Sequence, residues 1–102
     1  MFGFTDEELI QIREIFSCYE GIEKALIFGS RAKGNYRNGS DVDIALTGAG
    51  INADIILEIS SFLNEETYLP YRFDLIDYNS VNRVELKEHI DRAGKLIYQK
   101  KS

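Results

Sequence analysis

The order of hydrophobic and polar positions divides this 102-residue chain into helical and extended blocks. The first block, residues 5–20, repeats apolar residues at the spacing of one helix face. Thr5 and Glu8 have the spacing of a capping box, so we expect the helix to begin there. Cys18 lies off the apolar stripe, and we expect it to be half exposed and without a role.

Three short apolar runs have the character of β-strands, at residues 22–28, 41–47 and 71–77. A long amphipathic block between the second and third runs predicts a helix. Asn52 is expected to cap that helix, which continues to Tyr68, shortly before a proline that prevents further helical turns.

The last third of the chain predicts one more helix, from about Val81 to Arg92, with Gly94 as its C′ residue. Residues 95–98 add a short terminal strand, and a short helix is expected from Ser30. The element order is therefore αβ(short α)βαβα(β), which predicts an α/β fold with helices packed on a sheet. The length predicts a single domain over residues 1–102 with one core.

The composition disfavours several classes of protein. A net charge of −5 argues against a domain that coats nucleic acid. The first residues lack the features of a signal peptide, and no apolar run approaches the length of a membrane span. The single cysteine excludes an internal disulfide and fits a reducing cytoplasm.

Asp41 and Asp43 lie two residues apart and share one face of the second predicted strand. At about 4 Å and an effective dielectric constant near 20, two unit charges repel each other by roughly 4 kcal/mol. A fold tolerates this repulsion where the charges point into water or where a cation lies between them. Hard divalent cations such as Mg²⁺ take carboxylate ligands together with substrate phosphates.

Asp74 supplies a third carboxylate near the middle of the third predicted strand. A long helix joins the second and third strands, so we expect them to pair in parallel, which would let Asp74 converge with Asp43 and Asp41. The link from Ser30 to Asp41 is short, so the first two strands should be antiparallel and the sheet mixed. Asp77 has the opposite parity and is expected in a turn.

Gly29 and Ser30 follow the first predicted strand and have the properties of an anion-binding turn. Glycine lets the backbone approach a phosphate closely, and a serine at the start of a short helix offers a hydroxyl and amides. Arg31 and Lys33 can neutralise phosphate charge. Beside three carboxylates, these groups indicate a metal–triphosphate site, in which two metal ions would align the attacking and leaving oxygens.

Several of these features also have structural alternatives. A Gly-Ser turn is commonly only a turn, and an Asp-x-Asp pair is commonly solvated. Tyr36 either stacks on a base or packs in its loop, and Arg72 either pairs with Asp74 or binds phosphate. His89 is expected at the edge of the apolar stripe of the last helix.

The segment GSRAKGNYRNGSDVD resembles the Gly-Ser-x10-Asp-x-Asp signature of the DNA polymerase β-like nucleotidyltransferase superfamily, since ten residues separate Ser30 from Asp41. Over nearly the whole chain, the sequence is similar to the minimal nucleotidyltransferases, which are encoded beside HEPN-domain proteins. The resemblance implies that Asp41, Asp43 and Asp74 bind two Mg²⁺ ions and that Asp74 helps to activate the attacking hydroxyl. It also implies that the triphosphate of ATP or another nucleoside triphosphate is held by Gly29, Ser30, Arg31 and Lys33.

The resemblance further implies a reaction and a partner. AMP would pass from ATP to a tyrosine of a HEPN toxin-like protein from a neighbouring gene, so that this protein would act as a cytoplasmic antitoxin. Larger relatives carry a further helical domain for the acceptor, so here the acceptor surface is expected on another chain, in a homo- or hetero-oligomer. Two alternatives stay open: a binding module that neutralises its partner by occlusion, and nucleotidyl transfer to a small molecule or RNA.

Overall fold

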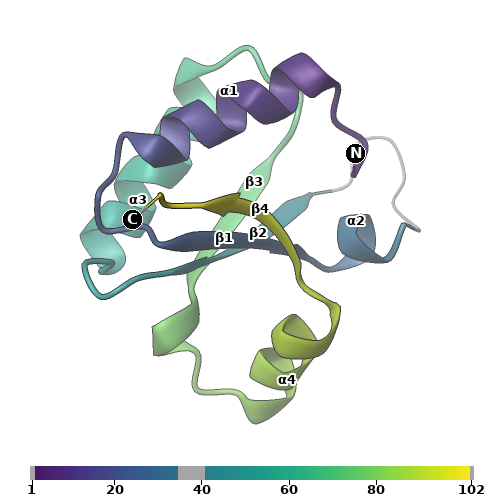
Figure 1. The fold of residues 1–102 in the computed structure, drawn as a ribbon, viewed down its shortest axis with the longest axis vertical. Helices are drawn as coiled ribbons and strands as arrows, with labels where there is room; N and C mark the ends of the chain where they lie inside the picture. Colours follow the sequence, from purple (N-terminus) through teal and green to yellow (C-terminus); the bar gives the residue numbers. More distant parts are fainter. Residues whose placement is uncertain (1, 35–40, 102) are drawn as a thin grey trace.

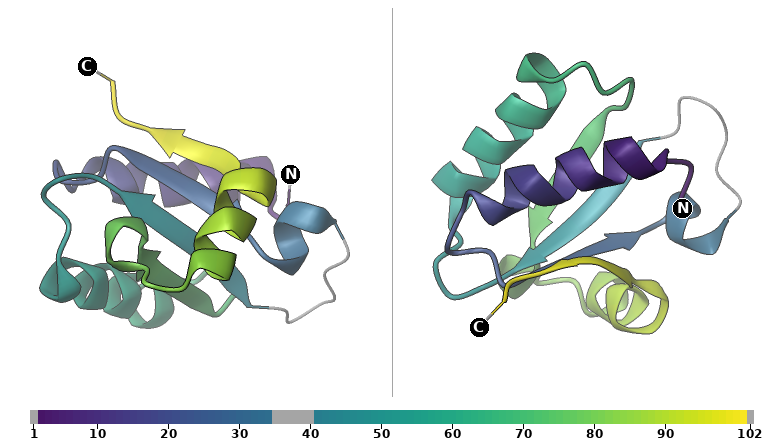
Figure 2. Two further views of the ribbon diagram at one scale, coloured as in Figure 1. Left: turned by 90° about the horizontal axis from the view of Figure 1, so that it is seen from below. Right: turned by 45° about the horizontal axis from the view of Figure 1, so that its top comes forward.

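A four-stranded sheet with helices on both faces forms the computed structural model, which describes residues 2–34 and 41–101 (Figure 1). The elements in chain order are α1 (Asp6–Ser17), β1 (Lys24–Phe28), α2 (Ser30–Lys33), β2 (Val42–Thr47), α3 (Ala53–Ser61), the π-helix η1 (Phe62–Glu66), β3 (Phe73–Asp77), the 3₁₀-helix η2 (Tyr78–Ser80), α4 (Val84–Ala93) and β4 (Lys95–Gln99). α1 and α3 cover one face of the sheet, and α4 packs on the other (Figures 1 and 2). The predicted α/β order is confirmed, with two short helical turns added.

The strands lie in the order β3-β2-β1-β4, and the sheet is mixed as predicted. β1 runs antiparallel to β2 and to β4, whereas β2 and β3 run parallel. The connection through α3 returns the chain to the same end of the sheet, which is what a parallel neighbour requires. β3 and β4 are therefore the two edges of the sheet.

Alternate residues of the central strand build the core beneath α1 and α3. Val42, Ile44 and Leu46 of β2 are fully buried there, and Ile12 and Phe16 of α1 pack against the same cluster. A strand presents successive side chains to opposite faces, so the residues between these three point away from the core. Within the described ranges, no helix has both the length and the apolar character needed to cross a bilayer.

α1 begins at the predicted capping box. The Thr5 hydroxyl accepts a hydrogen bond from the Glu8 backbone N–H, and the Glu8 carboxylate accepts one from the Thr5 backbone N–H. The Tyr71 hydroxyl, just before β3, also donates to Glu8 and so ties this helix start to the far edge of the sheet. Cys18 ends the helix and is exposed, more so than the half exposure expected from the sequence.

The helix predicted from Asn52 changes its winding before it ends. Asn52 caps α3 as expected, but the α-helix stops at Ser61, and a wider π-helical turn, η1, follows it. In that turn Leu63 is buried. The Asn64 side chain accepts a hydrogen bond from the Phe73 N–H at 2.8 Å and donates one to the Phe73 carbonyl at 3.1 Å. Asn64 thus pairs with the edge of β3 as a neighbouring strand would.

The last helix begins one turn later than predicted. α4 starts at Val84, because a turn precedes it. In that turn the Asp77 carboxylate accepts hydrogen bonds from the Asn79 N–H and the Ser80 hydroxyl. The expectation that Asp77 lies in a turn is confirmed.

Gly94 ends α4, but in an ordinary extended conformation rather than the left-handed one expected of a C′ glycine, with φ −65° and ψ 141°. Glycine is needed here for a different reason. A Cβ at this position would lie 2.5 Å from the carbonyl oxygen of Ile90. Because glycine has no side chain, its backbone can pack against the Ile90 carbonyl, and β4 begins at the next residue.

We expect Gly94→Ala to destabilise the protein by about 1–3 kcal/mol, because the added methyl group forces the helix end and β4 apart. For a domain of this size, each kcal/mol corresponds to a fall in Tm of roughly 4–8 °C, measurable by thermal denaturation. Glu88→Ala, at an exposed position of the same helix, is the control and should change stability by less than about 0.5 kcal/mol. Equal melting of the two variants would contradict the steric explanation.

Candidate active site

Two carboxylates lie side by side near the start of the parallel strand pair. Asp43 and Asp74 are register partners across β2 and β3, and each is the second residue of its strand. Because Val42 and Ile44 point into the core, the carboxylate between them is directed to the opposite face, the one that carries α4. Asp43 is half-buried there, and Asp74 is exposed on the edge strand.

The carboxyl group of Asp43 has a pKa raised above its ordinary value of 3.8. The largest cause is burial, which removes water from the charged form, and the charges of Asp74 and Asp41 add repulsion. Asp41 is exposed one residue before β2. The other two predicted carboxylates therefore both act electrostatically on Asp43. Within residues 2–34 and 41–101, no three acidic, histidine or cysteine side chains already form a closed ligand set.

Gly29 brings the turn after β1 against the Asp43 carboxylate. The preceding residue, Phe28, pairs with Asp43 across the antiparallel strands, so the turn begins beside that carboxylate. Gly29 has φ 74° and ψ −151°, which side chains disfavour, and a Cβ on it would lie 2.5 Å from Asp43 Oδ2. Both the backbone conformation and this close approach require glycine.

Ser30 and Lys33 are the first and last residues of the short helix α2, which follows the turn. Ser30 is half-buried next to Gly29, and Lys33 is exposed. Their expected contacts with a triphosphate stay predictions, as do the ligand roles of the three aspartates.

Arg31 lies elsewhere than expected. Its side chain is only 3% exposed, and its Nη1 donates a hydrogen bond to the Phe2 carbonyl at 3.0 Å. The guanidinium lies over the rings of Phe4 and Tyr71, 5.6 and 5.0 Å from their centroids. Arg31 therefore fastens the residues before α1 to α2, and its expected help in holding a triphosphate stays a prediction.

His89 and Arg72, also singled out in the sequence, are among the residues that the structure describes. His89, half-buried on α4, packs edge to face against Phe28 with ring centroids 6.2 Å apart, which confirms its expected place at the edge of the helix stripe. Arg72 is exposed, and in the part of the chain that the structure describes it forms no ion pair with Asp74. Tyr36 lies outside the described residues.

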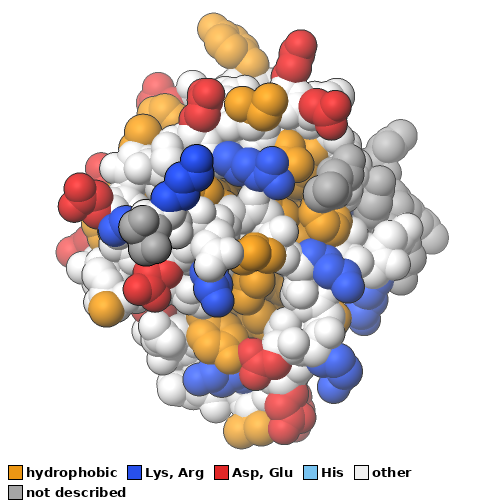
Figure 3. Space-filling model, viewed as in Figure 1, with side chains coloured by type: hydrophobic (Ala, Val, Ile, Leu, Met, Phe, Trp, Pro, Cys, Tyr) orange, Lys and Arg blue, Asp and Glu red, His pale blue; other side chains and the backbone are white. Residues whose placement is uncertain are grey.

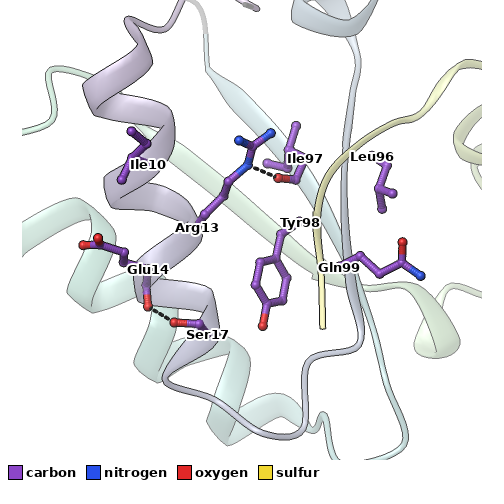
Figure 4. Close-up of a pocket in the computed structure, with 8 residues that line it drawn as sticks. All are labelled: Ile10, Arg13, Glu14, Ser17, Leu96, Ile97, Tyr98 and Gln99. Carbon is purple, nitrogen blue, oxygen red and sulfur yellow. Dashed lines mark hydrogen bonds between the residues drawn. The ribbon is translucent and has the colours of Figure 1, made fainter. Parts of the chain in front are cut away.

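Two grooves also mark the surface, and no pattern in the sequence predicts either. The first, of about 470 Å³, lies between α1 and β4 and includes Ile10 and Leu96 (Figure 4). It belongs to the face in Figure 3 on which hydrophobic side chains lie between Lys and Arg side chains. β1 separates this groove from the carboxylates of β2. The second, of about 640 Å³, follows β3 from Leu75 to Asp77 and so begins directly after Asp74.

The chain belongs to the family described as Polymerase beta, Nucleotidyltransferase, whose model matches residues 10–102. That stretch contains the Gly29-Ser30 turn and all three aspartates. The mixed sheet packed with helices is the polymerase β-like nucleotidyltransferase fold, and the chain is a nucleotidyltransferase domain.

Solved structures share this fold at low sequence identity. A toxin–antitoxin crystal structure with AMP-PNP matches with a TM-score of 0.72 and 22% identity, over 95% of this chain and 76% of that chain. The toxin–antitoxin MntA-HepT matches with a TM-score of 0.70 and 19% identity, over 94% and 74%. A tri-AMPylated Shewanella oneidensis HEPN toxin in complex with MNT antitoxin matches with a TM-score of 0.65 and 20% identity, over 98% and 74%. No curated protein matches the chain.

We expect Asp43→Asn to stabilise the metal-free protein, because it removes a partly desolvated charge that faces Asp74. Like charges in directly opposed strand positions destabilise by about 0.2–1 kcal/mol, so Tm at pH 7 should rise by a few degrees. As the pH falls below 3.8, the wild-type carboxyl becomes protonated in both the folded and unfolded states, so the difference should shrink there. It should grow as the pH rises through the raised pKa of the folded state.

Thermal denaturation from pH 3.5 to pH 8 checks this prediction. Glu66→Gln, an exposed carboxylate outside the site, is the matched control and should show no such pH-dependent gain. A lower Tm for Asp43→Asn at neutral pH would contradict the repulsion described above.

A second prediction concerns the contact between the turn and the carboxylate. Gly29→Ala should destabilise by about 1–3 kcal/mol, because alanine is strained at φ 74° and its methyl group collides with Asp43 Oδ2. Asp43→Ala removes the collision but not the strain. In a double-mutant cycle by urea denaturation, Gly29→Ala should therefore cost less in the Asp43→Ala background. Strict additivity would show that the two residues do not touch.

Proposed function

We propose that this domain transfers a nucleoside monophosphate, AMP from ATP, to a tyrosine hydroxyl of a HEPN-type partner protein and thereby acts as an antitoxin in the cytoplasm. The observation that carries the proposal is the pairing of Asp43 with Asp74 beside the Gly29 turn. The choice of acceptor is supported by the fold shared with the complex of a tri-AMPylated HEPN toxin and an MNT antitoxin. The choice of nucleotide is supported by the toxin–antitoxin structure with AMP-PNP.

The donor set fits a divalent cation. Asp43 and Asp74 offer hard oxygen ligands, and burial, together with the charges of Asp74 and Asp41, raises the pKa of Asp43, so a nearby cation would favour its charged form. In this proposal Asp41, Asp43 and Asp74 hold Mg²⁺, in two ions. When bound, Mg²⁺ supplies charge neutralisation to the triphosphate and to the leaving pyrophosphate.

The remaining steps belong to the chain itself. The Gly29 backbone lets the triphosphate approach β1, and Ser30 and Lys33 offer a hydroxyl and a positive charge to its oxygens. Asp74 orients the acceptor hydroxyl and takes its proton, since it is the exposed carboxylate of the pair. The acceptor oxygen bonds to the α-phosphorus, the bond from that phosphorus to the bridging oxygen breaks, and pyrophosphate leaves.

The test is label transfer from ATP to the HEPN protein of the neighbouring gene in the presence of Mg²⁺. We expect Asp41→Asn with Asp43→Asn to lower the transfer rate by at least about 100-fold, because each change removes a carboxylate ligand of the Mg²⁺ that would neutralise the reacting phosphate. Asp54→Asn, an exposed position on α3, is the control and should retain the rate. Transfer that survives the double substitution would show that these carboxylates are not required for catalysis.

The same variants separate this proposal from its alternatives. In cells, neutralisation of the partner by the double variant would favour occlusion without transfer. Transfer to RNA or to small hydroxyl compounds in the absence of the partner would favour a different acceptor. A rise in Tm with Mg²⁺ and AMP-PNP, about 2.7 kcal/mol of stabilisation at one hundred times Kd, reports binding without turnover and should be absent from the double variant.

A further inference from the structure

The outer edge of β3 is partly closed and partly open. The Arg72 carbonyl accepts a hydrogen bond from the Val42 N–H, so backbone groups at even-numbered positions of β3 face β2. By alternation, those of Phe73 and Leu75 face outward. The Asn64 side chain forms hydrogen bonds with both the N–H and the carbonyl of Phe73. Within residues 2–34 and 41–101, nothing takes the outward groups of Leu75.

A groove of about 640 Å³ follows this open part of the edge. Leu75–Asp77 lies between two walls, of which α3 forms one and Ser80–Arg83 with Leu86 forms the other. The α3 wall is apolar at its rim, where the Leu57 side chain is 67% exposed. A free strand edge flanked by apolar side chains is the arrangement by which a sheet binds an extended peptide as an additional strand.

The groove begins on β3 at the residue after Asp74, one of the proposed catalytic carboxylates. Ile76, which lines it, shares a strand face with Asp74 and lies about 7 Å further along β3, two residues at roughly 3.3 Å each. Asn64 occupies the edge at Phe73, so a strand added at Leu75 cannot continue past that point. A segment that leaves the edge there passes next to Asp74.

The charge of the groove indicates what kind of segment fits. Two of its described lining residues are charged. Asp77 already accepts hydrogen bonds from Asn79 and Ser80, whereas Arg83 is exposed at the rim. An apolar segment with an acidic residue near Arg83 is complementary to this lining.

The groove between α1 and β4 is a poorer place for the acceptor. Arg13 Nε donates to the Ile97 carbonyl at 2.7 Å and so occupies part of that edge (Figure 4). A segment bound there would also be separated from Asp43 by β1. The groove between α1 and β4 instead offers a matched control, because Leu96 is 47% exposed within it.

We propose that the open edge of β3 binds the acceptor-bearing segment of the partner polypeptide as an added strand and presents its hydroxyl to Asp74. The segment is extended, places apolar side chains against α3 and Leu86, and carries an acidic residue near Arg83. This inference rests on the proposed transfer to a partner protein and deepens it by assigning the place of the acceptor.

The kinetic test compares Leu57→Lys with Leu96→Lys; both leucines are exposed, Leu57 on α3 in the groove along β3 and Leu96 on β4 in the other groove. With the HEPN protein as acceptor, Leu57→Lys and Arg83→Glu should each raise the KM for the acceptor by roughly tenfold and leave the KM for ATP unchanged. Leu96→Lys should leave both within about twofold of wild type. Equal KM values for the acceptor in Leu57→Lys and Leu96→Lys would overturn the proposal.

A second measurement does not depend on turnover. Amide hydrogen exchange at Leu75 should slow when the HEPN protein binds, while exchange at Gln99 on the β4 edge should not change. Protection at Leu75 without label transfer would support the docking site and reject the proposed chemistry. Transfer without that protection, protection at Gln99 alone, or no complex at all would overturn the docking site.

Discussion

The strand register that places Asp43 opposite Asp74 is the constraint on which the rest of the site depends. It is enforced by the core: a one-residue shift of β2 would separate the carboxylates, but it would also turn Val42 and Ile44 out of the packed layer beneath α1 and α3. Apolar burial on one face thus holds like charges together on the other. In the proposed function, a bound cation would relieve the repulsion between these charges and would also attract the triphosphate.

The residues that follow β1 make two different kinds of contact. Gly29 lets the backbone touch the Asp43 carboxylate, while Arg31, two positions later, points toward Phe4 and Tyr71 and holds the start of the chain against α2. A segment that reads as one phosphate-binding motif is therefore partly structural. The positive charge of Lys33 remains exposed where Arg31 is not.

The sequence pattern along the chain was sufficient to predict the pairing of the carboxylate-bearing strands, but not the contacts that depend on residues distant in sequence. The parallel pairing of Asp43 with Asp74 follows from strand alternation and the length of the connection through α3. The burial of Arg31 depends on Phe4 and Tyr71, which are remote in sequence, so its charge alone did not indicate that it is buried. The contact of Asn64 with Phe73 depends on a π-helical turn that the hydrophobic pattern does not reveal.

Both edges of the sheet carry a polar side chain bonded to the strand backbone: Asn64 on Phe73 of β3, and Arg13 on Ile97 of β4. Sheets with two unpaired edge strands can associate edge to edge, with β3 of one molecule against β4 of the next, and such head-to-tail pairing can continue into a fibre. Here each edge offers only a short free stretch. In the proposed docking, the Asn64 amide that would stop an incoming strand at Phe73 would also shorten the part of β3 open to another copy of the sheet, as Arg13 does on β4.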